Sequence, residues 1–220
     1  MSTLDDRLGA LRDKFGSFLK PEITEQLDRH TAELRSHTGA TLKGGDKAPT
    51  FALSDQNGKT IASTDLLKSG PLVVSFFRGT WCPYCNEELT ALAASYADFR
   101  ATGAELVMIT PQSSDNAKDY LTEHRVPFSV LVDSDAKVAE AFGLAYDMPQ
   151  YMRDIYTNAF GNDLTKVNDA KTWRLTIPGR FIIAQDGTIT SAEFDADYRF
   201  RPEVTATLAT LQSAKLTGVK

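Results

Sequence analysis

The chain has 220 residues, of which 42% are hydrophobic and 24% charged, as in a folded protein of one elaborated domain or two small ones. Twenty-four basic residues against 29 acidic ones give a net charge of −5, so binding to nucleic acid is not expected. The longest apolar runs, such as residues 71–77, are too short to cross a membrane. The N-terminus has early acidic residues and no apolar segment typical of a signal peptide, so we expect the protein in the cytoplasm.

The first part of the chain is expected to be helical. Apolar residues recur at steps of three and four along residues 4–19, which predicts a helix with one buried face. Pro21 fits the first turn of a second helix, because a backbone N–H is not needed there. Glycines and a proline end this stretch. We therefore expect a helical N-terminal extension over residues 1–43 and a second unit over residues 44–220.

From residue 48 onward, predicted strands alternate with helices. Residues 72–77 are almost all apolar, which is typical of a buried central strand. Gln56-Asn57-Gly58 predicts a type I′ hairpin turn and Asp186-Gly187 a second hairpin. Residues 147–172 are less regular and are interpreted as an insertion, with an amphipathic piece near 151–160. This order predicts an α/β fold with a central mixed β-sheet flanked by helices. The other expected elements are strands 51–53, 60–62, 105–110, 128–132, 181–183 and 188–190, and helices 87–100, 115–124, 138–142 and 204–211.

The chain contains two cysteines, Cys82 and Cys85, between the predicted central strand and a helix. A helix N-terminus presents unpaired N–H groups and a positive dipole end, so the pKa of Cys82 is expected to be low. One turn later, Cys85 can attack a sulfenic acid or mixed disulfide formed on Cys82. A disulfide that closes so small a loop gains little stability and stays reducible.

Two other interpretations of the thiols involve no redox chemistry. They could be small buried core residues, or ligands of a zinc ion. A structural zinc site needs four ligands, and the remaining candidates are His30, His37 and His124. His30 and His37 are seven residues apart on one helix face, which is more typical of a surface. The sequence Trp-Cys-Pro-Tyr-Cys at a strand–helix junction favours redox chemistry, so no metal is expected.

The strand, the Trp-Cys-x-x-Cys sequence and the helix resemble the thioredoxin superfamily. Over nearly its whole length the chain is similar to the peroxiredoxin-like branch of the alkyl hydroperoxide reductase/thiol-specific antioxidant family. The resemblance implies a thioredoxin-like fold and a thiol-dependent peroxidase that reduces hydrogen peroxide or organic hydroperoxides through a Cys-x-x-Cys cycle. It further implies thioredoxin, glutaredoxin or glutathione as reductant and no bound cofactor. Acidic helices such as those expected at the N-terminus often make dimer contacts, which would give a homodimer. The residues that carry the resemblance are the helical N-terminal extension and segments 43–51, 78–85, 109–112 and 178–183.

The chain also departs from the family pattern. Peroxiredoxins carry a Pro-x-x-x-Thr/Ser-x-x-Cys sequence, and neither Cys82 nor Cys85 ends such a sequence here. They also place an arginine at the start of the strand that corresponds to 181–183. In this chain Pro178 occupies that position, which resembles the cis-proline of thioredoxins, and Arg180 follows two residues later. The residues expected to bind substrate are Thr80, Trp81, Pro178 and Arg180.

The order in which the thiols act stays open. The helix start favours Cys82 as the attacking thiolate, whereas Cys85-x-x-Glu88 resembles the residues that follow the attacking cysteine in peroxiredoxins. Arg78 would favour a thiolate nearby, unless it is simply solvated. The alternative function is a thioredoxin-like protein-disulfide oxidoreductase without significant peroxidase activity. A third interpretation is a redox-inert binding module that uses residues 147–172 for its partners.

Overall fold

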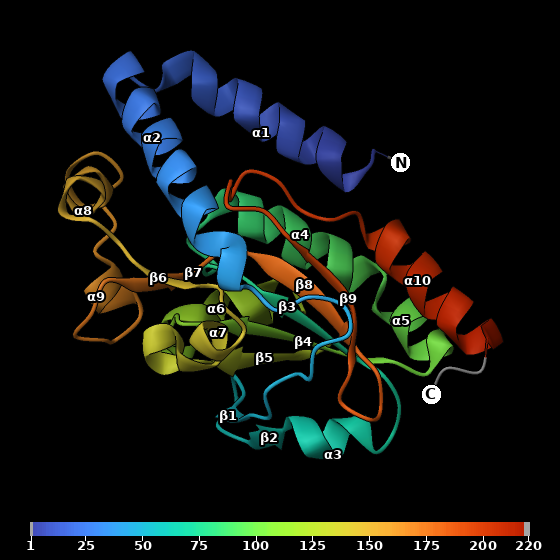
Figure 1. The fold of residues 1–220 in the computed structure, drawn as a ribbon. Helices are drawn as coiled ribbons and strands as arrows, with labels where there is room; N and C mark the ends of the chain where they lie inside the picture. The colour runs from blue at the N-terminus through green and yellow to red at the C-terminus, as the bar shows by residue number, and fades with distance from the viewer. Residues whose placement is uncertain (1, 218–220) are drawn as a thin grey trace.

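The computed structural model describes residues 2–217, and a five-stranded sheet with helices on both faces forms its centre (Figure 1). β3 (Leu72–Phe76) is the middle strand; it is parallel to β4 (Glu105–Thr110) and antiparallel to β8 (Gly179–Ile183). β5 (Ser129–Val132) and β9 (Ile189–Phe194) form the two edges. All five residues of β3 are buried, as expected for a central strand. The predicted α/β fold with a central mixed sheet is confirmed.

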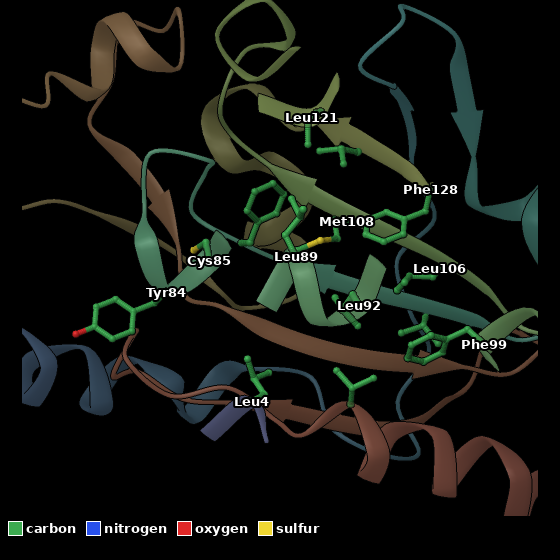
Figure 2. Close-up of a cluster of buried hydrophobic side chains, with 14 of the residues drawn as sticks. Leu4, Tyr84, Cys85, Leu89, Leu92, Phe99, Leu106, Met108, Leu121 and Phe128 are labelled. Atoms are coloured by element: carbon green, nitrogen blue, oxygen red, sulfur yellow. The ribbon is translucent and has the colours of Figure 1, made fainter. Parts of the chain in front are cut away.

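Each face of the sheet carries its own apolar core, because successive residues of a strand point to opposite faces. Val73 belongs to one core and Val74 to the other. In the first core, Cys85 and Leu89 lie on one helix, and Leu89 lies beside Met108 of β4 (Figure 2). The second core contains residues of α7 (Lys137–Ala141). The helices after β3 that contribute to the first core are α4 (Pro83–Ala94), α5 (Tyr96–Thr102), α6 (Ser114–Glu123) and α10 (Val204–Thr217).

The predicted N-terminal helices are confirmed as α1 (Leu4–Phe18) and α2 (Pro21–His37). Leu4 and Leu8 are buried in the same core as α4, so the extension packs directly on the rest of the chain (Figures 1 and 2). Glu203, just before α10, accepts hydrogen bonds from the first backbone N–H groups of α1 at 2.7 and 3.3 Å. The division of the chain near residue 44 stays a prediction.

The helix predicted over residues 87–100 differs from the one observed. It begins earlier, at Pro83, and Ser95 divides it into α4 and α5 with φ −102° and ψ 6°. Most other predicted strands and helices lie within two residues of their expected bounds, but β9 ends four residues later than expected, at Phe194, and α10 six residues later, at Thr217. None of the helices in residues 2–217 is long and apolar enough to span a membrane. The sequence did not predict α3 (Ser63–Leu67), β6 (Ala145–Asp147), α9 (Leu164–Val167) or β7 (Arg174–Thr176).

The first predicted hairpin is present, with β1 (Ala52–Ser54) antiparallel to β2 (Thr60–Ala62). Its turn is not of type I′, which requires positive φ at two successive central residues. Within this turn only Gly58 has positive φ, at 81°. The Asp55 carboxylate instead accepts hydrogen bonds from two backbone N–H groups of the turn. An aspartate just before the expected turn therefore decides its geometry.

The segment interpreted as an insertion carries α8 (Gln150–Asn158), as its amphipathic pattern predicts, and then α9. β6 and β7 pair antiparallel at its base. Met152 and Tyr156 of α8 pack with Leu27 of α2 in a third apolar cluster. The segment therefore lies beside α2, as Figure 1 shows.

Candidate active site

The two thiols lie where the central strand passes into α4. A short loop leads from β3 to Cys82, the N-cap residue of α4, and Pro83 occupies the first turn. The predicted position of the Cys-x-x-Cys sequence at a helix start is confirmed. Both cysteines are reduced and buried, with 2% of Cys82 and none of Cys85 exposed. Within the described residues, no group of three or more His, Cys, Asp or Glu side chains is arranged to hold a metal ion.

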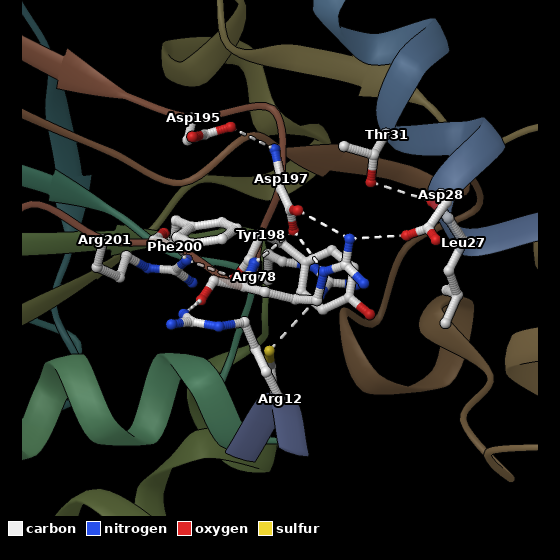
Figure 3. Close-up of polar contacts among 12 residues, drawn as sticks. Arg12, Leu27, Asp28, Thr31, Arg78, Asp195, Asp197, Tyr198, Phe200 and Arg201 are labelled. Carbon is white, nitrogen blue, oxygen red and sulfur yellow. Dashed lines mark hydrogen bonds and ion pairs between the residues drawn. The ribbon is translucent and has the colours of Figure 1, made fainter. Parts of the chain in front are cut away.

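Arg78 lies directly beside the Cys82 sulfur. Its Nη1 is 3.5 Å from Cys82 Sγ. The guanidinium lies over the rings of Tyr198 and Trp81, at 4.0 and 4.8 Å from their centroids, and Figure 3 shows it against Tyr198. Arg78 is 2% exposed, and its Nε has no hydrogen-bond partner among the described residues. Arg78 is therefore a buried cation aimed at a thiol, not a solvated arginine.

A second arginine, Arg201, contacts Cys85. Its Nη2 lies 3.2 Å from Cys85 Sγ, and its Nη1 donates to the carbonyls of Tyr198 and Phe200 at 2.6 and 2.7 Å. Its Nε donates to Glu88 Oε2 at 2.6 Å. All three guanidinium nitrogens are thus engaged, which fixes the group against Cys85; Figure 3 shows it beside Phe200 and Tyr198.

Glu88 neutralises positive charge beneath the thiols. Besides Arg201, its carboxylate accepts hydrogen bonds from Arg180 at 2.8 Å and from the Ser75 hydroxyl at 2.9 Å. The carboxylate is 1% exposed. Burial alone would raise the pKa of Glu88, but the charges of Arg201 and Arg180 outweigh burial and lower the pKa below its ordinary 4.5. Glu88 is therefore an ionised carboxylate inside the protein.

The environment separates the pKa values of the two thiols. Burial raises the pKa of Cys82, but a hydrogen bond from Cys85 and the charges of Arg78 and Arg201 outweigh it and lower the pKa to about 5. For Cys85, burial, the hydrogen bond to Cys82 and the Cys82 charge raise the pKa well above its ordinary value. At neutral pH the pair therefore holds a thiolate on Cys82 and a proton on Cys85.

A cavity of about 490 Å³ opens onto Cys82. Arg78 and Trp81 line it beside the sulfur, and its walls come from α1, α2, the end of α8 and the loop before α10. Cys82 lines this cavity, whereas Cys85 does not. A molecule that enters the cavity therefore meets the Cys82 sulfur.

Two of the residues predicted to bind substrate lie in the loop before Cys82. Trp81 lines the cavity. Thr80 is buried, and its N–H donates to the Gln112 side chain at 2.6 Å while its hydroxyl also bonds with that side chain. Thr80 neither caps α4, whose N-cap is Cys82, nor lines the cavity. A role in substrate binding stays a prediction for both residues.

The other two predicted residues lie at the start of β8. Arg180 is buried against Glu88 and not against a thiol. Pro178 is buried, and residues 2–217 contain no cis peptide bond, so the expected likeness to the cis-proline of thioredoxins is wrong. No pattern in the sequence marks Arg201 as part of the site. Glu88 could be found from the sequence, because its spacing from Cys85 resembles the family pattern.

Comparisons with known proteins agree with this geometry. The model of the AhpC/TSA family matches residues 44–192. A chloroplastic peroxiredoxin Q from Sedum lineare is 29% identical over 180 residues, which cover 80% of this chain and 81% of that protein. The thiol-disulfide oxidoreductase ResA of Bacillus subtilis (strain 168) is 34% identical over 106 residues, 48% of this chain and 58% of ResA. Among solved structures, peroxidoxin BcpB from Mycobacterium tuberculosis matches with a TM-score of 0.61 and 21% identity, covering 78% of this chain and 97% of that one.

The family match covers most of the chain, from just before β1 into β9. It includes both cysteines, Arg78 and Glu88, and it ends before Arg201. The resemblance implied by the sequence is therefore confirmed. The chain belongs to the AhpC/TSA family, as a peroxiredoxin-like, thiol-dependent peroxidase of the thioredoxin superfamily.

Proposed function

We propose that Cys82 attacks the hydroperoxide and that Cys85 resolves the product. The observation that carries this proposal is the asymmetry of the pair. Cys82 has its pKa lowered to about 5 and lines the cavity, whereas the pKa of Cys85 is raised and Cys85 does not line it. The thiolate is the reactive form of a cysteine.

In the first step, the Cys82 sulfur attacks the distal oxygen of the hydroperoxide. A sulfur–oxygen bond forms as the oxygen–oxygen bond breaks, so Cys82 becomes a sulfenic acid. The other oxygen leaves as water or an alcohol once it has taken a proton. Arg78 provides positive charge near the reacting sulfur, together with an unpartnered Nε–H, and so stabilises the charge that moves to the leaving oxygen.

In the second step, the Cys85 sulfur displaces the hydroxyl group of the sulfenic acid. The two sulfurs form a disulfide, and the hydroxyl leaves with the Cys85 proton as water. Arg201 contacts Cys85 Sγ and lowers the cost of the negative charge that develops there. Two thiol groups of a reductant then restore both cysteines and are themselves oxidised to a disulfide.

The family implies a thiol reductant, and we expect it to be thioredoxin, glutaredoxin or glutathione. Each candidate can be supplied with its own reductase and NADPH, and the rate of NADPH oxidation with hydroperoxide identifies the one that supports turnover. The homodimer and the cytoplasmic location stay predictions from the sequence.

The reaction of the reduced protein with hydroperoxide should depend on the Cys82 thiolate. Because the pKa of Cys82 is lowered to about 5, the rate should be constant around neutral pH and fall as the pH drops through about 5. Free cysteine, with a pKa near 8.5, gains rate throughout the neutral range. Stopped-flow mixing across this pH range measures the rate. A rate no faster than that of free cysteine at neutral pH would refute the peroxidase mechanism.

Replacing Arg78 tests the source of the low pKa. Arg78→Met keeps much of the buried volume but removes the charge, so the pKa of Cys82 should rise by roughly 1–3. The ultraviolet absorbance of the thiolate, followed against pH, measures this pKa. Arg78→Lys keeps the charge and serves as the control, with a smaller expected rise. An unchanged pKa in Arg78→Met would mean that Arg78 does not stabilise the thiolate.

Protein-disulfide exchange is the second candidate function. The Cys-x-x-Cys sequence at a helix start and the similarity to ResA favour it. The 2% exposure of Cys82 weighs against it, because a protein disulfide has to reach that sulfur. Rapid reduction of insulin in the presence of dithiothreitol, without rapid reaction with hydroperoxide, would favour this function. Native thiols that resist alkylation would instead favour the redox-inert module.

A further inference from the structure

The walls of the cavity come mainly from parts of the chain outside the thioredoxin-like core. α1 and α2 precede residues 44–192, which the family model matches. Phe15 of α1, Leu27 of α2 and Leu19 between the two helices line the cavity, and Phe160 lines it from the segment after α8. The N-terminal extension and the insertion thus meet in front of the reactive sulfur, and their contribution is largely apolar.

The cavity is much larger than hydrogen peroxide requires. Its volume is about 490 Å³. A water molecule occupies roughly 30 Å³ of liquid, and hydrogen peroxide has only one more oxygen atom. The open space therefore fits a hydroperoxide with a large organic group.

The charges around the cavity indicate that this organic group is uncharged. Arg12 and Arg199 line the wall, but both are already paired with carboxylates. Arg12 contacts Asp5 at 3.1 Å, and Arg199 contacts Asp28 at 2.7 Å and also pairs with Asp197. Figure 3 shows Arg12 and Asp28 on the two N-terminal helices, beside the loop that carries Asp197. The third arginine of the wall, Arg78, faces the Cys82 thiolate at 3.5 Å. Each of the three arginines therefore has a negative partner, and the remaining wall offers a largely apolar surface.

We propose that α1, α2 and the segment after α8 form a specificity pocket for hydroperoxides with a bulky, uncharged apolar group, in preference to hydrogen peroxide. This inference rests on the proposed function of Cys82. The bonds that form and break are those of the peroxidase step, and the organic group leaves as its alcohol. Burial of an aryl or branched alkyl group should lower the KM of such a hydroperoxide by roughly 10- to 100-fold relative to hydrogen peroxide.

Gly16 offers a way to fill the pocket. Gly16 lines the cavity and lies four residues after Arg12, which also lines it, so the two share one face of α1. A Cβ atom added at Gly16 meets nothing within 4 Å. Replacing a helical glycine also improves helix propensity. Gly16→Leu should therefore fold and place its side chain in the pocket.

The test compares kcat/KM for cumene hydroperoxide with kcat/KM for hydrogen peroxide. In the wild-type protein this ratio should exceed one, and Gly16→Leu should reduce it at least about 10-fold. Gly39→Leu is the matched control, because a Cβ there also meets nothing within 4 Å and Gly39 does not line the cavity. A wild-type preference for hydrogen peroxide, or a ratio unchanged in Gly16→Leu, would overturn the specificity pocket.

A binding measurement separates this inference from the proposed function. 2-Phenyl-2-propanol, the alcohol derived from cumene hydroperoxide, undergoes no reaction with the thiols. Calorimetry should show that it binds to the wild-type and Gly39→Leu proteins with a negative heat-capacity change, and at least about 10-fold more weakly to Gly16→Leu. If the alcohol binds in this way but the wild-type protein reduces no hydroperoxide, the peroxidase mechanism is rejected and the apolar pocket is retained. Equal binding to all three proteins would overturn the pocket.

Discussion

Cys82→Ser should consume no hydroperoxide above the uncatalysed rate, while Cys85→Ser should still complete one reaction per chain. Serine at position 82 keeps the shape of the site but removes the sulfur that is oxidised. In Cys85→Ser the Cys82 thiolate remains, but the sulfenic acid has no nearby thiol to condense with. It should therefore accumulate, and turnover with a disulfide-forming reductant should stop.

The measurement follows hydroperoxide loss in single-turnover mixing and labels the product with dimedone, which traps sulfenic acids, before mass spectrometry. Cys85→Ser should carry one label, on Cys82, and Cys82→Ser none. The wild-type protein is the control and should end as an intramolecular disulfide without label. The reverse pattern, with the label on Cys85, would show that Cys85 attacks first, as the Cys85-x-x-Glu88 spacing suggests.

Glu88→Gln should cause the largest loss of stability expected from a single substitution at this site. It leaves Arg180 and Arg201 buried without their shared counter-charge, and breaking a buried ion pair in this way costs about 3–5 kcal/mol. In a protein of this size the melting temperature should fall by roughly 6–20 °C. Urea unfolding of the reduced protein measures the free energy.

The neighbouring residue supplies the control for this substitution. Glu87 pairs with Arg7 at 3.3 Å, and both side chains are about one-third exposed. Glu87→Gln should therefore change the free energy of unfolding by less than about 1 kcal/mol. Because folding lowers the pKa of Glu88, the stabilisation of the folded protein by the Glu88 charge is complete above pH 4.5. It is lost as the pH falls through the pKa of Glu88 in the folded protein. Equal effects of the two substitutions would show that Glu88 does not stabilise the buried arginines.

The elements that position Cys82 could be predicted because their signals are local. The apolar run of β3 and the proline after Cys82 mark a buried strand that leads into a helix start within a few residues. The break at Ser95 had no such signal, since neither glycine nor proline lies there. The predicted type I′ turn was wrong for a similar reason. The conformation of that turn depends on the side chain of Asp55, which lies outside the expected turn residues.

The partners of the thiols could not be predicted, because the fold brings them together from distant parts of the chain. Arg201 contacts Cys85 across 116 residues of sequence, and it follows a loop that has no periodic pattern. The contact of Arg180 with Glu88 has the same origin, since antiparallel pairing sets Arg180 opposite Ser75, and Ser75 also bonds Glu88. Substrate binding by Arg180 stays a prediction. The cavity, built from segments before and after Cys82, depends on the packing of α1 and α2.

The attachment of α1 has a kinetic consequence for the return of electrons. Leu4 and Leu8 anchor this helix in the core, and Glu203 holds its first turn. Because α1 forms part of the wall in front of Cys82, we expect that a folded protein reductant reaches the Cys82–Cys85 disulfide only after α1 moves outward, whereas a small thiol can diffuse in. Regeneration by a protein reductant should then reach a plateau as its concentration rises, because helix opening becomes the slowest step. Removing the carboxylate of Glu203, which holds the first turn of α1, should raise this maximum rate of regeneration.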